Sequence, residues 1–273
     1  MNKILTLYNI EFKRIYKLYL SLIGALFIGN LLAIFKVINY TINRIANENK
    51  LVKSFSLLKT NLGQDFITHT ARYGVYFYTT IILAIAVFIC LGYAAYIWYR
   101  DYFSNSKTIY TLLSLPQPRF NIYLAKLMVV VFMIYGVIIS QVLFWYIDLN
   151  ILKLISGIGS SGFTNVYKMI QHNIELKLIS PYFSDFLMID FLGIILAVVV
   201  IFTGVLIERS FKKIGIILGA LYIVFSIMGY FYIIINQTFV SDGLLFKHIV
   251  YYIFIFGLSL FISYKLLNKR ICV

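Results

Sequence analysis

The chain has 273 residues, of which 62% are hydrophobic and only 12% are charged. A soluble domain has about 45–50% apolar and about 25% charged residues, so this composition argues against a soluble fold and favours an integral membrane protein. The net charge of +14 does not indicate nucleic-acid binding, because the Lys and Arg residues lie scattered at the ends of apolar runs.

The first 18 residues predict an amphipathic helix and not a signal peptide, since charged residues precede any apolar core. On a helical wheel, apolar side chains gather on one face and basic side chains on another. We expect an interfacial helix with its apolar side in lipid and its basic side toward the headgroups. A plain extension of the first span is the alternative. The residues expected to define this helix are Phe12, Lys13, Arg14, Ile15 and Lys17.

Six apolar runs follow, each about 20 residues or longer, which is enough to cross a hydrocarbon core of about 30 Å. They predict an all-α protein, a single domain over residues 1–273 with six transmembrane helices. The charged residues inside or beside the runs stand at their edges, where they can snorkel to the interface: Lys36, Lys126, Asp190, Lys247 and Lys265. The predicted spans are residues 19–38, 75–98, 122–147, 186–207, 214–235 and 245–267.

The distribution of Lys and Arg predicts that both termini are cytoplasmic. With the N-terminus inside, the inner segments carry 14 of the 24 basic residues, and five of the other ten lie in one long outer loop, residues 39–74. Short segments decide orientation, and they favour this arrangement. We therefore expect a multi-pass protein of the cell membrane.

The two long outer segments, residues 39–74 and 148–185, contain apolar residues spaced by three and four. This spacing predicts short amphipathic helices near residues 51–66 and 163–178 that lie on the outer surface. They either cap the bundle or screen a substrate. On the inner side, residues 208–213 are so short that the fourth and fifth spans must be antiparallel neighbours.

The longest inner segment joins the second and third spans and reads Y-R-D-Y-F-S-N-S-K-T-I-Y-T-L-L-S-L-P-Q-P-R-F-N-I-Y-L-A-K over residues 99–126. It contains a run too short to span a bilayer, which ends at Pro116. Proline disfavours helix in the residue before it, so we expect a helix of about two turns that closes at Leu115. The residues of this short helix are Lys107, Thr108, Ile109, Tyr110, Thr111, Leu112, Leu113, Ser114 and Leu115.

This pattern and the six-span layout resemble the permeases of ABC-2-type transporters. The resemblance implies that residues 107–115 form the coupling helix that docks on an ATP-binding subunit, with Pro116 as its stop and Arg119 and Lys126 at the entry to the next span. It also implies that residues 3–17 are the elbow helix of that family. The partners would be a cytoplasmic ABC ATPase, which holds ATP and Mg²⁺, and a second permease copy or a related permease.

No catalytic or metal-binding constellation is visible in the sequence, and no P-loop motif occurs, so we expect no cofactor in this chain. Carboxylates able to relay protons are nearly absent from the apolar runs, because Asp148 and Glu208 lie outside them and Asp190 lies at an edge. This favours energy supplied by another subunit. The few polar side chains within the runs join helices or line a path: Asn30, Thr79, Thr80, Ser140, Gln141, Thr203, Ser226 and Ser259.

The function that the sequence favours is the permease subunit of an ATP-driven transporter, which exports a hydrophobic or amphipathic compound such as a peptide antibiotic or drug. It is not expected to be an enzyme. Two alternatives are a membrane-bound enzyme, such as a lipid-modifying transferase, and a membrane scaffold or sensor that transports nothing.

Overall fold

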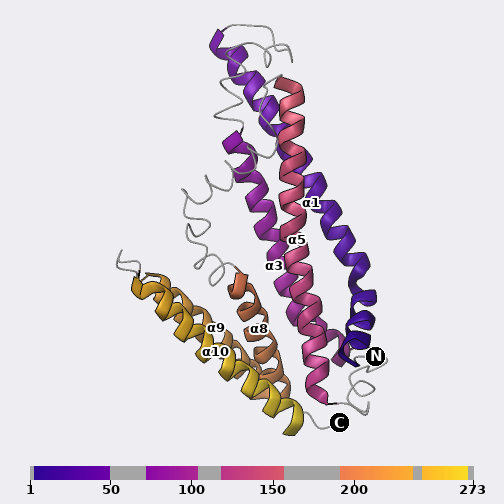
Figure 1. Cartoon of the computed structure of the whole chain (residues 1–273), viewed down its shortest axis with the longest axis vertical. Coiled ribbons are helices and arrows are strands. Elements are labelled where there is room, and N and C mark those ends of the chain that lie inside the picture. The colour runs from indigo at the N-terminus through magenta and orange to yellow at the C-terminus, as the bar shows by residue number, and fades with distance from the viewer. Residues whose placement is uncertain (1–2, 50–71, 104–117, 157–190, 236–241, 270–273) are drawn as a thin grey trace. The chain divides into compact units, whose positions relative to one another are not determined.

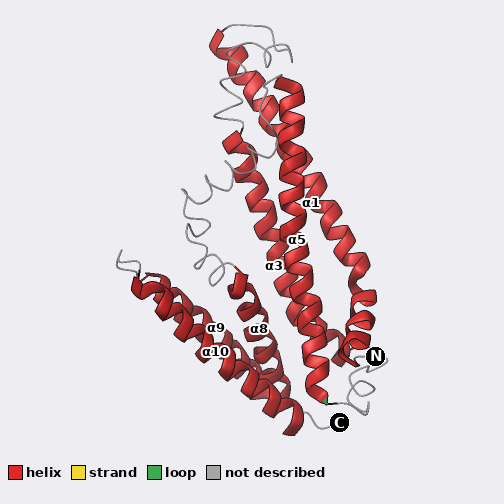
Figure 2. Cartoon of the chain, viewed as in Figure 1, coloured by secondary structure: helices red, strands yellow, loops and turns green. Residues whose placement is uncertain are grey.

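A computed structural model describes residues 3–49, 72–103, 118–156, 191–235 and 242–269. Within these ranges every regular element is a helix (Figure 2). The predicted helices at 51–66, 107–115 and 163–178 lie outside the described residues. The six helices, labelled in Figure 1, are α1 (Lys3–Asn49), α3 (Arg72–Phe103), α5 (Arg119–Ser156), α8 (Leu192–Ser210), α9 (Lys212–Ile235) and α10 (Asp242–Lys269).

All six helices contain a stretch that is long and apolar enough to cross a membrane. This confirms the predicted all-α class and the six apolar spans. Several helices continue beyond the apolar runs: α1 extends from residue 38 to Asn49, and α5 extends from residue 147 to Ser156. Hydropathy marks the part of a helix that suits lipid, whereas the helix itself ends only where its backbone hydrogen bonds end.

The expected elbow is not a separate element, because α1 is one continuous helix of 47 residues. At about 1.5 Å per residue it is about 70 Å long, more than twice the thickness of a hydrocarbon core. The reason is visible in the sequence: no proline or glycine occurs before Gly24, so nothing breaks the helix between the basic segment and the first span.

The chain divides into two compact units. The first unit comprises residues 1–15, 89–134 and 179–273, and the second comprises residues 16–88 and 135–178. The chain passes from one unit to the other within three of the helices, α1, α3 and α5.

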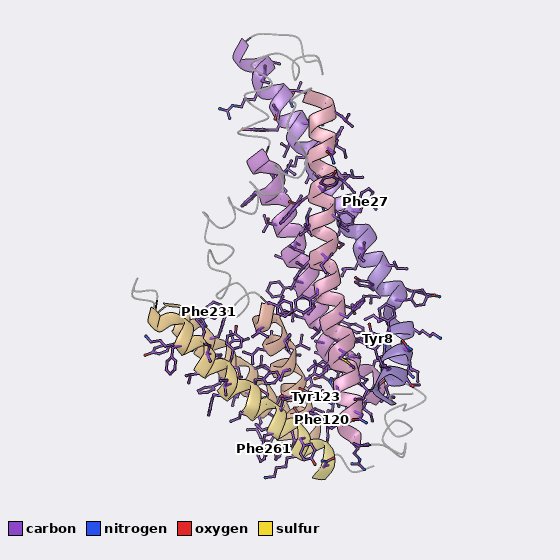
Figure 3. The ribbon with its side chains drawn as sticks, viewed as in Figure 1. Tyr8, Phe27, Phe120, Tyr123, Phe231 and Phe261 are labelled. Carbon is purple, nitrogen blue, oxygen red and sulfur yellow. The ribbon has the colours of Figure 1, made fainter. Side chains whose placement is uncertain are left out.

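In the first unit, α8, α9 and α10 pack side by side (Figure 1). Aromatic rings of α3, α5 and α8 meet in its core, where the Phe202 ring lies edge-on to Trp98 and Tyr123, at 5.7 and 5.5 Å between centroids. Tyr123 is labelled in Figure 3 beside Phe120, and the two rings stack with centroids 5.3 Å apart. Large aromatic side chains therefore pack together and bury apolar surface in this core.

A single residue, Phe211, separates α8 from α9, which confirms that the fourth and fifth spans are neighbours. Glycines make this hairpin tight. A Cβ atom on Gly219 would lie 2.5 Å from the carbonyl oxygen of Gly204, and one on Gly215 would collide with the carbonyl oxygen of Glu208. Small residues at such positions let helix backbones approach closely within a membrane.

In the second unit, α1, α3 and α5 are joined by polar contacts. Asn30 and Gln141 exchange two hydrogen bonds, at 3.1 Å from Asn30 Nδ2 and 2.8 Å from Gln141 Nε2. Trp145 Nε1 donates to Thr79 Oγ1 at 2.9 Å. An apolar layer of Ile34, Val37, Ile38, Ile42 and Val75 completes the described core.

The prediction that polar side chains join helices is confirmed for several residues. Thr203 Oγ1 of α8 lies 3.0 Å from Ser263 Oγ of α10, and Tyr222 of α9 shares a 2.6 Å hydrogen bond with Ser259 of α10. In contrast, Ser140 donates to a carbonyl oxygen of its own helix, Val137 O, at 2.8 Å. The predicted polar residues that bond between helices are Asn30, Thr79, Gln141, Thr203 and Ser259.

Large apolar side chains are exposed along α9 and α10, as Phe231 and Phe261 in Figure 3 illustrate, with exposed fractions of 55% and 66%. In water such surface would be unfavourable, at about 25 cal/mol per Å². Lipid removes this penalty, so the exposed side chains agree with helices that cross a membrane.

Candidate functional site

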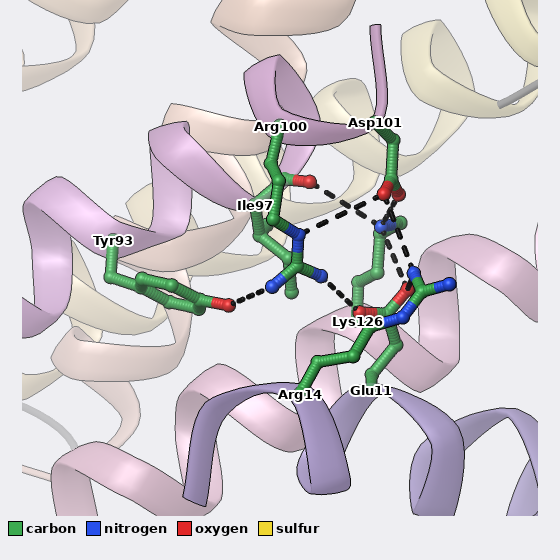
Figure 4. A network of polar contacts seen from close by, with 7 residues as sticks. All are labelled: Glu11, Arg14, Tyr93, Ile97, Arg100, Asp101 and Lys126. Carbon is green, nitrogen blue, oxygen red and sulfur yellow. Dashed lines mark hydrogen bonds and ion pairs between the residues drawn. The ribbon is translucent and has the colours of Figure 1, made fainter. Parts of the chain in front are cut away.

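Five charged side chains meet in the first unit, where α1, α3 and α5 come together (Figure 4). We call Glu11, Arg14, Arg100, Asp101 and Lys126 the ion-pair cluster. Lys126 Nζ is at its centre and forms ion pairs with Asp101 and, at 3.1 Å, with Glu11 Oε1. The Lys126 side chain is 0% exposed, and the residues Glu11 and Asp101 are 3% and 1% exposed.

Two arginines complete the cluster. Arg100 donates from Nη2 to Glu11 Oε2 at 2.6 Å, and from Nη1 to the Tyr93 hydroxyl at 2.9 Å. Arg14 Nη1 lies 3.6 Å from Glu11 Oε1 and 3.5 Å from Asp101 Oδ1. Each carboxylate therefore faces the same three cations, and the cluster holds one positive charge in excess.

Helical spacing brings these groups together. Glu11 and Arg14 are three residues apart on α1, and Tyr93, Ile97 and Arg100 recur on one face of α3. Lys126 lies in the second turn of α5, from where its ammonium group also reaches Ile97 O at 3.5 Å. The same ammonium lies 5.3 Å from the centroid of the Trp98 ring, within the range of a cation–π contact.

A buried charge costs several kcal/mol of desolvation unless it is paired, and removal of one partner typically destabilises by about 3–5 kcal/mol. A buried network of this kind is therefore poor evidence for stability but specifies one arrangement of the helices that carry it. The cluster fixes the starts of α1 and α5 against the end of α3. The cluster can hold three helices in place through ion pairs, but it contains no nucleophile activated by a neighbouring base.

Further contacts attach the same helix ends to the rest of the first unit. The Tyr99 hydroxyl donates to Glu208 Oε2 of α8, and the Arg209 guanidinium lies 4.6 Å from the centre of the Tyr99 ring. Arg119 Nη1 donates to the carbonyl oxygen of Leu267 on α10 at 3.0 Å. The residues that precede and follow 104–117 therefore contact α1, α8 and α10.

The predicted coupling-helix residues, 107–115, lie outside the described residues. The predicted elbow residues are described, and they divide into two groups. Ile15 is buried at 1% exposure, and the Phe12 ring lies 5.7 Å from that of Phe132 on α5, so part of the apolar face packs on protein. Lys13 and Lys17 are exposed, whereas Arg14 joins the cluster.

The expectation that Lys126 snorkels to the interface is wrong, because the side chain is fully buried and ion-paired. Sequence analysis also missed Glu11 and Asp101. A signal was present: Glu11 is the only acidic residue among the first 40, and Asp101 is the only one between residues 66 and 147. Isolated carboxylates among basic residues at the ends of apolar runs are candidates for buried pairing.

The described residues do not bring together three or more His, Cys, Asp or Glu side chains that could hold a metal ion. The architecture defines a helical protein with six helices able to cross a membrane. No family model, no curated protein and no solved structure matches the chain.

Proposed function

We propose that this chain is the transmembrane permease subunit of an ABC transporter, in which a separate cytoplasmic ATPase binds ATP and Mg²⁺. Six apolar helices support a membrane-spanning role. The sequence pattern over residues 99–126 supports the assignment to the ABC-2 type. In this proposal residues 107–115 form the coupling helix, and two permease subunits act together, either two copies or a related pair.

The observation that carries the proposal is the anchoring of both flanks of residues 104–117. On the N-terminal flank, Arg100 pairs with Glu11. On the C-terminal flank, Lys126 pairs with Glu11 and with Asp101 of the opposite flank. A segment that receives force from an ATPase must pass it to helices that do not yield independently. Buried, mutually paired charges meet that need, because their separation leaves charges unpaired in a low-dielectric interior.

The proposed activity is export of a hydrophobic or amphipathic compound, which is what the resemblance implies. The start of α1, with Lys13 and Lys17 exposed, would lie against anionic headgroups of the inner leaflet. A lipid-modifying transferase and a scaffold remain the alternatives from other classes. Co-purification with an ATPase would separate the proposed function from both.

The test is isolation of the tagged full chain from membranes of its own host, followed by identification of bound proteins and measurement of ATP hydrolysis. We expect an ABC-type ATPase at equal stoichiometry. Tyr110→Glu and Ser114→Arg should release this ATPase, because a bulky charge at a docking surface costs several kcal/mol when it remains unpaired. The helices should still fold, as circular dichroism would report.

Lys247→Glu provides the matched control, since Lys247 is exposed on α10 and belongs to neither the cluster nor residues 107–115. It should retain the ATPase. Wild-type stoichiometry and transport in the Tyr110→Glu and Ser114→Arg variants would place the docking site elsewhere. Absence of any ATPase from the wild-type preparation would refute the permease assignment.

A further inference from the structure

Asp148 is a buried carboxyl group that the proposed transport mechanism does not use. It lies on α5 in the second unit and is 2% exposed. Its Oδ2 atom has no hydrogen-bond partner, and no ion pair joins it to any residue in the described part of the chain. The sequence placed Asp148 outside the apolar runs, but the structure places it within a helix and among buried side chains.

The face of α5 that carries Asp148 is polar over two helical turns. Gln141 pairs with Asn30 of α1, and Trp145, four residues on, donates to Thr79 of α3. Asp148 follows three residues later on the same face. Gln141 and Trp145 each have a hydrogen-bond partner on a neighbouring helix, whereas Asp148 Oδ2 has none.

On its other side, this face of α5 becomes apolar. Ile151 and Ile155 pack against the layer formed by Ile34, Val37, Ile38, Ile42 and Val75. A buried hydroxyl of α1, Thr41 Oγ1, donates to its own helix at Val37 O. Along α5, Asp148 therefore lies between hydrogen-bonded polar side chains on one side and an apolar layer of side chains on the other.

Among the described side chains of the neighbouring helices, no cation pairs with Asp148. On α1, the Lys36 ammonium lies 4.4 Å from the centre of the Tyr78 ring, and Arg44 is exposed and forms no ion pair with Asp148. The described side chains of α3 in this unit carry no charge. Asp148 is nearly inaccessible to solvent and has no counter-ion among the described side chains, and burial without a partner disfavours the charged form of a carboxyl group.

We propose that Asp148 is a proton-binding site: its carboxyl group carries a proton in the arrangement described and releases it when this part of the second unit opens to water. The step breaks the O–H bond of the carboxylic acid and transfers the proton to a water molecule, without any redox change. Rebinding takes the proton from hydronium. The inference does not depend on the permease assignment. It assigns reversible proton binding to the second unit, which is separate from ATP hydrolysis in a partner subunit.

Infrared spectroscopy of the purified full chain in lipid nanodiscs tests the proposal directly. A protonated carboxylic acid has a carbonyl stretch that is well separated from the carboxylate bands. At neutral pH the difference spectrum between wild type and Asp148→Asn should contain this acid band. Loss of only carboxylate bands in that difference spectrum would overturn the proposal.

Asp101→Asn is the matched control, because Asp101 is as deeply buried but is paired with Lys126 and Arg14. Its difference spectrum should contain carboxylate bands and leave the acid band unchanged. If the same acid band is lost in both variants, it does not belong to Asp148 and the proposal fails.

The pH dependence of unfolding provides a second readout that does not rest on spectral assignment. The unfolded chain loses the aspartic proton above about pH 4, whereas the folded chain keeps it. Raising the pH from 5 to 8 should therefore lower the unfolding temperature of wild type relative to Asp148→Asn. A constant difference between the two over this range would contradict proton binding by the folded chain.

Discussion

The ion-pair cluster shows how charge balance, and not the burial of one group, decides the effect of a substitution. Three cations face two carboxylates, so the cluster carries one excess positive charge, and Arg14, at 34% side-chain exposure, is the member nearest to solvent. Removal of Lys126 leaves two arginines for two carboxylates. Removal of Glu11 leaves three cations for one carboxylate, although Lys126 is the more deeply buried of the two.

We therefore expect Glu11→Gln to lower the free energy of unfolding by about 3–5 kcal/mol and Lys126→Met to lower it by less. The double variant should be less destabilised than the sum of the single variants, because the two side chains share one network. Equilibrium unfolding of the purified chain in detergent measures all three. Lys13→Gln, on the exposed side of α1, should change stability by no more than about 0.5 kcal/mol. Additive single effects would mean that Glu11 and Lys126 act independently.

At the scale of elements, the α8–α9 hairpin depends on backbone contact, since its glycines leave no room for a side chain. The clash predicted at Gly215 is with a carbonyl oxygen of the backbone, which cannot turn away. The clash predicted at Gly204 is with the end of the Ile223 side chain, at 2.6 Å, which can adopt another rotamer. The two sites thus differ in how they can relax.

Gly215→Ala should destabilise the chain by about 1–3 kcal/mol, as overpacking of a tight interface does, and Gly204→Ala should be milder. Gly257→Ala is the control, because no atom lies within 4 Å of a Cβ placed there on α10. It should be neutral or stabilise by up to about 1 kcal/mol, since alanine has the higher helix propensity. Thermal unfolding of the three variants measures these differences in stability. Equal losses at Gly215 and Gly257 would show that helix propensity and not hairpin packing sets the cost.

Across the whole molecule, hydropathy predicted the helices well and their contacts poorly. The six apolar runs record which segments suit lipid. Five of them lie wholly within a described helix, and residues 192–207 of the fourth run lie in α8. Glu11 and Lys126, by contrast, are 115 residues apart in the sequence, and no local sequence pattern predicts their contact. The length of α1 was missed for a related reason, because packing of Thr41, Ile42 and Ile45 extends a helix that hydropathy alone would end.

Orientation in the membrane is the largest inference that rests on charge alone, and the native cysteines make it testable. Cys90 is buried in α3, which leaves Cys272, the only other cysteine in the sequence, as the target for labelling. If both termini are cytoplasmic, a membrane-impermeant maleimide should label Cys272 only after the cells are permeabilised. A Ser241→Cys, Cys272→Ser variant should react in intact cells, because residue 241 lies in the expected last outer loop. Labelling of Cys272 in intact cells would reverse the orientation and would place residues 104–117 outside, where no ATPase could reach them.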